Sequence, residues 1–203
     1  MNNLENAFEE VSSIGRYSRK YFSYLAEILE SIDENEINKL GEAFESAREN
    51  GNTIFAAGNG GSAATATTMA NDIGFDIIKK TGTDKSFRLF SLVDNNSVVT
   101  GISNDVGYEN IFINQLKIHY RDGDSLLVIS ASGNSHNVLK AAKWVKEKGG
   151  TIIGFLGFTG GKLIDFCDIK IHVKSEAGEY GPVEDAHLIM NHILAHWFQN
   201  KLK

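Results

Sequence analysis

Two segments of the chain combine glycine, serine and asparagine in patterns that suit the binding of a phosphate group. The first is Gly58-Asn59-Gly60-Gly61-Ser62, which follows the apolar run Ile54–Ala56 and precedes an alanine-rich stretch. Its glycines allow a tight turn with exposed backbone N–H groups at the start of a helix, where anions bind. We expect Ser62 to cap that helix. An ordinary strand-to-helix turn is the alternative for this segment taken alone.

The second segment is Ser130-Ala131-Ser132-Gly133-Asn134-Ser135, directly after the apolar run that begins at Ser125. It lies at the carboxyl end of a predicted parallel strand, where open α/β sheets bind ligands. Three serines are more than a turn and a helix cap need. Neither segment is a P-loop, because no Lys-Ser/Thr follows, and neither has the spacing Gly-x-Gly-x-x-Gly. Hydroxyls and amides without a lysine favour a phosphomonoester.

Three titratable side chains are candidates for acid–base chemistry near these segments. Asp72 lies ten residues after Ser62, about 15 Å along the predicted helix. Glu184 and His192 are eight residues apart in the C-terminal helix, or about 80° around it, so that both can face one cleft. Imidazole is the usual proton shuttle near neutral pH. We interpret His187 and His196 as packing or surface groups.

The two loops, about seventy residues apart, resemble the sugar isomerase (SIS) domain family, and within it the bacterial phosphoheptose isomerases. The resemblance extends over the whole chain and includes Asn104-Asp105, Gly160-Gly161-Lys162, Glu184 and His192. It implies an aldose–ketose isomerase that converts sedoheptulose 7-phosphate to D-glycero-D-manno-heptose 7-phosphate through an enediol. It also implies one SIS domain over residues 1–203, with helices for oligomerisation in residues 1–50 and the sugar-phosphate-binding core in residues 51–203.

The resemblance assigns a role to individual positions. Asp72 matches the acid–base glutamate of the family, one methylene shorter, and His192 matches the catalytic histidine. Glu184 stands where the family has a glutamine that contacts metal and substrate. Ala131 replaces a frequent threonine and so removes one hydroxyl. The substrate and phosphate contacts fall on Asn59, Gly60, Gly61, Ser62, Asn104, Asp105, Ser130, Ala131, Ser132 and Ser135.

Zinc binding stays open at this stage. The family can hold zinc through a His and a Glu on the first core helix and a Gln and a His on the last. Here Thr68 replaces that first His, which removes a strong ligand. Asp72, Glu184 and His192 still offer two carboxylates and an imidazole, a three-ligand set with an open position. The same groups can also pair without any metal.

The departures at Thr68, Asp72 and Glu184 all fall in the catalytic set, while both phosphate loops are intact. One interpretation is an active isomerase with altered catalytic residues. The other is a non-catalytic, phosphosugar-binding SIS adaptor that binds a protein partner. The acid and the histidine at the two key positions favour the enzyme. The family implies a homotetramer with sites shared between subunits, in which Asp72 and His192 of one site can come from different chains.

Composition sets limits on the partners and the location of the protein. The 203 residues, 42% hydrophobic with one proline, are typical of a single folded domain. The net charge of −6 argues against nucleic acid or an anionic membrane as the main partner. The single Cys167 suits a reducing compartment, and no apolar stretch approaches the roughly 20 residues of a membrane span. We expect a cytoplasmic protein.

The elements that must position these residues follow from apolar periodicity. Leu4, Phe8, Val11, Ile14, Tyr17 and Tyr21 recur at spacings of three and four and predict one helical face, and a second helix is predicted from about Asp33-Glu34 to before Gly51. Strands near 53–57, 87–92, 125–130, 151–156 and 169–173 then alternate with helices near 62–73, 106–119, 136–148 and 183–201. This order predicts a doubly wound, mainly parallel five-stranded sheet flanked by helices, with an N-terminal helical extension.

Overall fold

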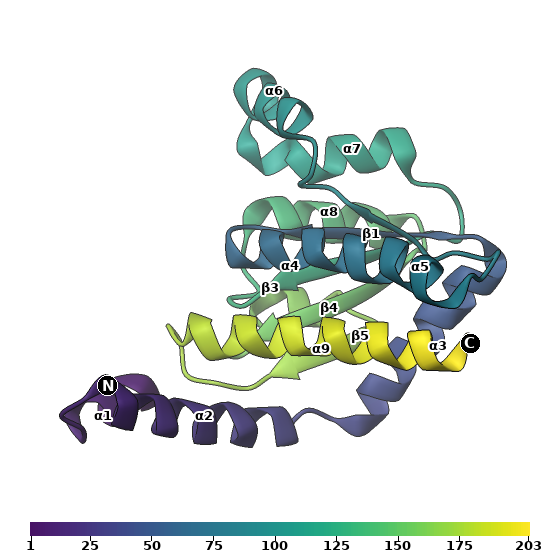
Figure 1. The fold of residues 1–203 in the computed structure, drawn as a ribbon. Helices are drawn as coiled ribbons and strands as arrows, with labels where there is room; N and C mark the ends of the chain where they lie inside the picture. The colour runs from purple at the N-terminus through teal and green to yellow at the C-terminus, as the bar shows by residue number, and fades with distance from the viewer.

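The computed structural model describes residues 1–203 and has a five-stranded parallel sheet at its centre, in the strand order β2-β1-β3-β4-β5 (Figure 1). The chain moves from β1 outward to β2 and then returns to β3 on the other side of β1. The gap between β1 and β3 is therefore the topological switch point, where ligands bind in such sheets. The strands are β1 (Thr53–Gly58), β2 (Arg88–Ser91), β3 (Ser125–Ser130), β4 (Thr151–Gly157) and β5 (Ile169–Val173).

The predicted doubly wound sheet is confirmed, and its burial explains why the strands could be recognised. Every residue of β1 and β3 is buried, because helices cover both faces of the sheet. Such strands are continuous apolar runs without polar alternation. The edge strand β5 alternates between buried and half-buried residues, as expected where one face is less covered.

One face of the sheet is covered by the helices that carry Asp72, Glu184 and His192. Their side chains form a single apolar cluster with the sheet, which includes Phe44, Met69, Ile73, Met190 and Phe198. Helix α4, the π-helical η1 and α5 follow one another without a break. The elements of this layer are α3 (Glu34–Asn50), α4 (Gly61–Met69), η1 (Ala70–Asp76), α5 (Ile77–Thr81) and α9 (Tyr180–Lys201).

The opposite face packs against α7 and α8 through a second apolar cluster, which includes Phe112, Leu116, Val138 and Val145. Helix α6 stands farther from the sheet, at the outer end of this layer (Figure 1), and has no buried residue. The elements here are α6 (Asn96–Val106), η2 (Tyr108–Asn110), α7 (Ile111–His119), α8 (His136–Glu147) and the short η3 (Gly161–Asp165). No helix of the protein is both long and apolar enough to cross a bilayer.

The N-terminal region is helical as predicted, but the first predicted helix is two helices. Helix α1 (Asn3–Glu9) ends before a break, and α2 (Ile14–Glu30) begins after it. The reason is local, because the Ser13 side chain accepts a hydrogen bond from the Arg16 N–H and so caps a new helix. The rings of Phe8 and Tyr17 still contact each other across the break, 6.2 Å between centroids. Helix α3 starts after Asp33 and ends at Gly51 as predicted.

Three further predictions about helices are wrong. Residues 96–106 were not expected to be helical, yet they form α6, capped by Asn95. The helix predicted over 62–73 continues through η1 and α5 to Thr81. Ser62 does not cap α4, because the cap position is Gly60, with φ of 57° and no side-chain hydrogen bond. Ser62 instead lies one residue into the helix and is buried.

Candidate active site

The glycine turn and the serine loop face each other at the carboxyl edge of the sheet, because β1 and β3 are neighbours in it. Between them lies a pocket of about 260 Å³. Helix α9 closes one side of this pocket with Tyr180 and Glu184. The complete lining is Asn59, Gly60, Gly61, Ser62, Ile129, Ser130, Ala131, Ser132, Ser135, Tyr180 and Glu184. Eight of the ten predicted substrate contacts therefore meet in one cavity.

Two helices begin at this pocket, and neither is capped by a side chain. Helix α4 begins after Gly60 and α8 begins after Ser135, and both cap residues line the cavity. The first N–H groups of a helix have no partner within the helix and carry the positive end of its dipole. A phosphate bound here would receive both helix ends together with the serine hydroxyls, without needing a lysine.

The serine loop is held in shape by its own hydrogen bonds and by a second glycine pair. The Ser130 and Ser132 hydroxyls accept from the N–H groups of Gly133 and Asn134, at 3.2 and 3.3 Å. A Cβ atom on Gly133 would overlap the backbone of Gly160, so the two loops pack backbone against backbone. The Gly160-Gly161-Lys162 motif thus packs against the serine loop and supports its shape.

Glu184 lies against the glycine turn. A Cβ atom on Gly61 would overlap the Glu184 carboxylate, so only glycine leaves room for it there. Burial raises the pKa of Glu184 above the usual range, and the charge of Asp185 adds to the effect. A glutamate with a raised pKa can hold and release a proton nearer to neutral pH than an exposed one. Glu184 therefore brings a half-buried carboxyl group with a raised pKa into the lining of the pocket.

Asp72 and His192 form a second group, in η1 and α9. The His192 Nε2 atom lies 3.6 Å from Asp72 Oδ2, with the imidazole half exposed and the carboxylate 18% exposed. Two amides also hold the carboxylate: Asn191 donates to Oδ2 at 2.7 Å and Asn71 donates to Oδ1 at 3.0 Å. Asp72 lies in a π-helical turn, and such turns often occur at functional sites. The pair has a base and an accessible proton shuttle side by side.

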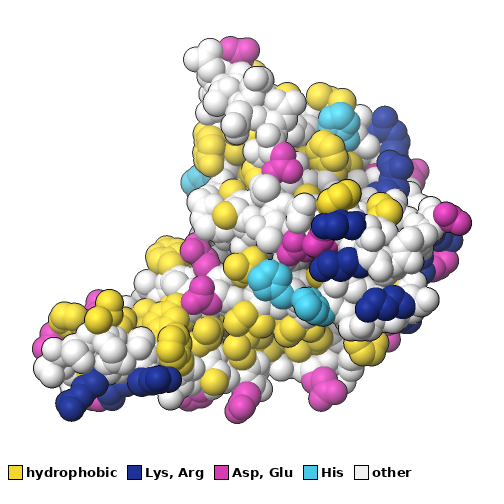
Figure 2. Space-filling view, in the orientation of Figure 1, with side chains coloured by type: hydrophobic (Ala, Val, Ile, Leu, Met, Phe, Trp, Pro, Cys, Tyr) yellow, Lys and Arg dark blue, Asp and Glu magenta, His cyan; other side chains and the backbone are white.

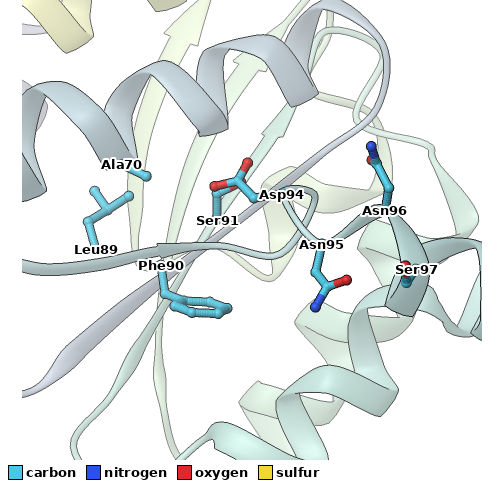
Figure 3. Close-up of a pocket in the computed structure, with 8 residues that line it drawn as sticks. All are labelled: Ala70, Leu89, Phe90, Ser91, Asp94, Asn95, Asn96 and Ser97. Carbon is cyan, nitrogen blue, oxygen red and sulfur yellow. The ribbon is translucent and has the colours of Figure 1, made fainter.

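A second hollow, of about 510 Å³, lies where β2 ends beside η1 (Figure 3). Its polar lining consists of Ser91, Asp94, Asn95, Asn96 and Ser97, and Asp94 is its one charged residue. The Thr67 hydroxyl donates to Asp94 at 2.5 Å from the neighbouring helix α4. No predicted site residue lines this hollow. A negative carboxylate makes it unsuited to phosphate.

Comparison with known proteins places the chain in a family. The family model of the SIS domain matches residues 20–157 of this chain. The phosphoheptose isomerase of Aneurinibacillus thermoaerophilus is 39% identical over 147 residues, which is 72% of this chain and 71% of that protein. Phosphoheptose isomerase 2 of Campylobacter jejuni is 34% identical over 190 residues, 91% of this chain and 92% of that protein. The chain belongs to the SIS domain family and, within it, to the phosphoheptose isomerases.

Solved structures agree with this placement of the SIS domain. The phosphoheptose isomerase of Neisseria gonorrhoeae superposes with a TM-score of 0.79 at 26% identity, covering 93% of this chain and all of that chain. The enzyme of Francisella tularensis gives the same TM-score at 22% identity, and at that identity it supports the fold alone.

Within one SIS domain, Glu184 and the Asp72–His192 pair lie apart. Glu184 and His192 are eight residues apart on α9, about 12 Å along its axis, and of the two only Glu184 lines the phosphate pocket. Asp72 and His192, expected from different chains, meet in the same chain. No three His, Cys, Asp or Glu side chains lie close enough to hold a metal ion, and the Thr68 hydroxyl donates to its own helix at Ala64. The proposed zinc ligands therefore do not fit a metal within this chain.

The remaining predicted contacts differ in what their side chains do. Asn59 exchanges two hydrogen bonds of 2.9 Å with Asn137 and accepts a third from Tyr108 at 2.7 Å, so its side chain is engaged within the protein. Its backbone still lines the pocket. Asn104 and Asp105 lie exposed on α6, bonded to each other at 2.9 Å, and do not line the phosphate pocket.

Sequence reasoning missed three asparagine and tyrosine partners of the site, Asn137, Tyr108 and Asn191. Asn137 follows the serine loop by two residues, which is a signal that could have found it. Tyr108 and Asn191 gave no such signal, because their contacts depend on the folding of distant segments.

The interpretation of His187 and His196 is confirmed. His187 is fully buried and donates from Nε2 to the Leu156 carbonyl at 3.3 Å, and burial lowers its pKa to about 4. His196 is exposed.

Proposed function

We propose that this chain is an aldose–ketose isomerase that interconverts sedoheptulose 7-phosphate and D-glycero-D-manno-heptose 7-phosphate through an enediol. The observation that carries the proposal is the pocket in which two uncapped helix N-termini meet the serine loop, with a paired aspartate and histidine on the same helical layer. The relatives that share these elements over most of their length are named phosphoheptose isomerases.

The phosphate group occupies the pocket between the glycine turn and the serine loop in this proposal. Ser130, Ser132 and Ser135 supply hydroxyls, while the first turns of α4 and α8 supply backbone N–H groups. These donors belong to rigid loops and not to long, flexible lysine or arginine side chains. A phosphate bound by them therefore fixes the position of the sugar chain.

Asp72 and His192 carry out the proton transfers. Asp72 removes the proton from the carbon beside the carbonyl, and the electron pair of that bond forms the carbon–carbon double bond of the enediol. His192 gives a proton to the former carbonyl oxygen as its charge develops. In the second half, the neighbouring hydroxyl loses its proton to His192, the new carbonyl forms, and Asp72 returns its proton to the adjacent carbon. No net proton is gained or lost.

Glu184 assists from within the pocket. Burial raises its pKa, and its carboxyl group lies against the glycine turn, where a sugar hydroxyl or a phosphate oxygen would be its partner. The family glutamine at this position would also donate a hydrogen bond there, so a protonated glutamate keeps that capacity.

We also propose that the protein works in the cytoplasm as a homotetramer, with residues 1–50 contributing to its interfaces and with sites shared between subunits. Apolar side chains gather along α2 and α9 at the surface of the single chain (Figure 2). Phe22, Ile193 and Trp197 are each about half exposed. Exposed apolar area of this kind is typical of protein interfaces. An assembly would also bring the pocket of one chain near the acid–base pair of another.

The test is a binding and turnover comparison of wild type, Asp72→Asn and Ser132→Ala with sedoheptulose 7-phosphate. We expect wild type to turn over, Asp72→Asn to bind the sugar phosphate normally by calorimetry with kcat lowered at least about 100-fold, and Ser132→Ala to weaken binding. Binding without turnover in wild type would instead support the non-catalytic adaptor. No binding at all would contradict the substrate.

A further inference from the structure

Asn191 is a fully buried side chain that hydrogen-bonds to the acid–base pair. It has no exposed surface, and its Nδ2 atom donates to Asp72 Oδ2 at 2.7 Å. The same carboxylate oxygen lies 3.6 Å from His192 Nε2. Asn191 and His192 are consecutive on α9, so one turn of this helix presents both groups to one oxygen.

The Asn191 amide is not satisfied by its surroundings. Its Oδ1 atom is buried and has no hydrogen-bond partner. An unpaired buried carbonyl oxygen destabilises the folded protein. An apolar side chain of similar size would therefore stabilise the fold about as well as this amide does. Its one polar contact is Asp72. A buried polar group that is poorly satisfied and points at a reactive side chain is better explained by function than by packing.

The orientation of the amide depends on the charge of Asp72. An ionised carboxylate only accepts hydrogen bonds, so Asn191 must present Nδ2 to it and leave Oδ1 unpaired. A protonated carboxyl could donate to Oδ1 after a flip of the amide. In the structure Nδ2 faces the carboxylate, so Asn191 is the donor and Asp72 is the acceptor.

We propose that Asn191 is a positioning residue that fixes the Asp72 carboxylate for proton abstraction, a role that rests on the isomerase function proposed above. Asp72 lies in a π-helical turn, and its other amide partner, Asn71, is its exposed neighbour in sequence. Asn191 is held by the packing of α9 against η1. It anchors Oδ2 beside the imidazole, while Oδ1 keeps only the exposed Asn71 as its partner.

The first part of the test compares Asn191→Leu with a matched control, Gln199→Leu. Gln199 is also a buried amide on α9, but its partner is Lys80, at 3.4 Å, away from the pair. We expect Asn191→Leu to lower kcat about 10- to 100-fold with KM changed less than about 3-fold, and to unfold at an unchanged or higher temperature. Gln199→Leu should keep the wild-type kcat.

The second part uses Asn191→Asp, which places two carboxyls at hydrogen-bond distance. They would share a proton, so the acidic limb of the kcat–pH profile should move upward by about one pH unit or more. Asn191→Leu in an Asp72→Asn background should lower kcat no further, because the group to be positioned is already gone.

The outcomes separate the positioning role from the function itself. An active wild type with normal kcat in Asn191→Leu would overturn the positioning role and leave the isomerase standing. A kcat of Asn191→Leu that falls only in proportion to a lowered unfolding temperature would also overturn the positioning role. A wild type that turns over no ketose phosphate would overturn both.

Discussion

At the scale of single residues, the site depends on groups whose neighbours leave no room for substitution. Gly61 is the clearest case, because its φ lies in the ordinary negative range and glycine is needed only for the space that Glu184 fills. His187 is a second case, since its buried imidazole, with an unpaired Nδ1, connects α9 to β4 through the Leu156 carbonyl.

Gly61→Ala should displace Glu184 without disturbing the fold. The new methyl group overlaps the carboxylate, which must leave the pocket, so we expect KM for the sugar phosphate to rise about 10-fold with the unfolding free energy changed by less than about 1 kcal/mol. Steady-state kinetics and urea unfolding measure the two quantities. Gly15→Ala, where the added methyl meets no atom within 4 Å, is the control and should keep the wild-type KM.

His187 should make the protein less stable at acidic pH. Its folded pKa of about 4 lies below the ordinary value of 6.5, so the unfolded chain binds more protons between these values. Its contribution is complete above about pH 6.5 and is lost as the pH falls toward 4, by about 2–3 kcal/mol at pH 4.5. Urea unfolding at pH 7.5 and 4.5 measures it. The difference in unfolding free energy between the two pH values should shrink in His187→Gln and persist in His196→Gln. An equal difference in wild type and both variants would contradict the prediction.

At the scale of elements, α2 is fastened to the start of α9 by two tyrosines. Tyr24 donates to the fully buried carboxylate of Glu179 at 2.5 Å, and Tyr21 donates to Asp185 at 2.6 Å. The backbone N–H of Asn3 also donates to Glu179, at 2.7 Å, which ties α1 to the same point. These contacts hold the turn of α9 that carries Glu184.

Tyr24→Phe should loosen this connection. The buried Glu179 carboxylate loses one donor, at a cost of about 1.5–3 kcal/mol for a hydrogen bond to a charged group. We expect faster amide hydrogen exchange in α1, α2 and the first turn of α9, with the sheet unaffected. Tyr17→Phe, whose hydroxyl makes no hydrogen bond in the structure, should leave exchange unchanged. Uniform protection in Tyr24→Phe would show that other contacts hold α2.

Elements with a strong apolar pattern were predictable, and those without one were not. The strands were visible because burial on both faces produces unbroken apolar runs. Helix α6 was missed because it buries no residue and its sequence mixes glycine with β-branched residues. At the site, the phosphate pocket followed from local loop chemistry. The Asp72–Asn191 contact, which joins residues 119 positions apart, could not be read from local patterns.

At the scale of the whole molecule, the functional groups lie at two places along α9. The phosphate pocket and the acid–base pair lie in the same helical layer. The pocket is at the start of α9, beside Glu184, and the pair is near the middle of α9, at His192. Apolar side chains on that helix face outward beside them. Assembly would bury these side chains and bring further groups to the site.

Trp197→Glu should therefore weaken assembly. Trp197 is 61% exposed in the single chain, and a charge there would oppose burial at an interface. We expect light scattering to show a tetramer for wild type and a smaller species for the variant, with specific activity reduced in parallel. A monomeric wild type with full activity would contradict the shared site.

The measurement that tests the central claim most directly is deuterium incorporation during turnover in D₂O, followed by NMR for wild type and Asp72→Asn. The account predicts that the proton held by Asp72 exchanges with solvent while the enediol lasts, so the aldose formed from sedoheptulose 7-phosphate carries deuterium at the carbon next to its carbonyl. Asp72→Asn should lose this exchange while still binding the sugar phosphate. If wild type isomerises without deuterium entry and Asp72→Asn is inactive, the proton is transferred while shielded from solvent, and Asp72 remains the base. Undiminished exchange in Asp72→Asn would contradict the account.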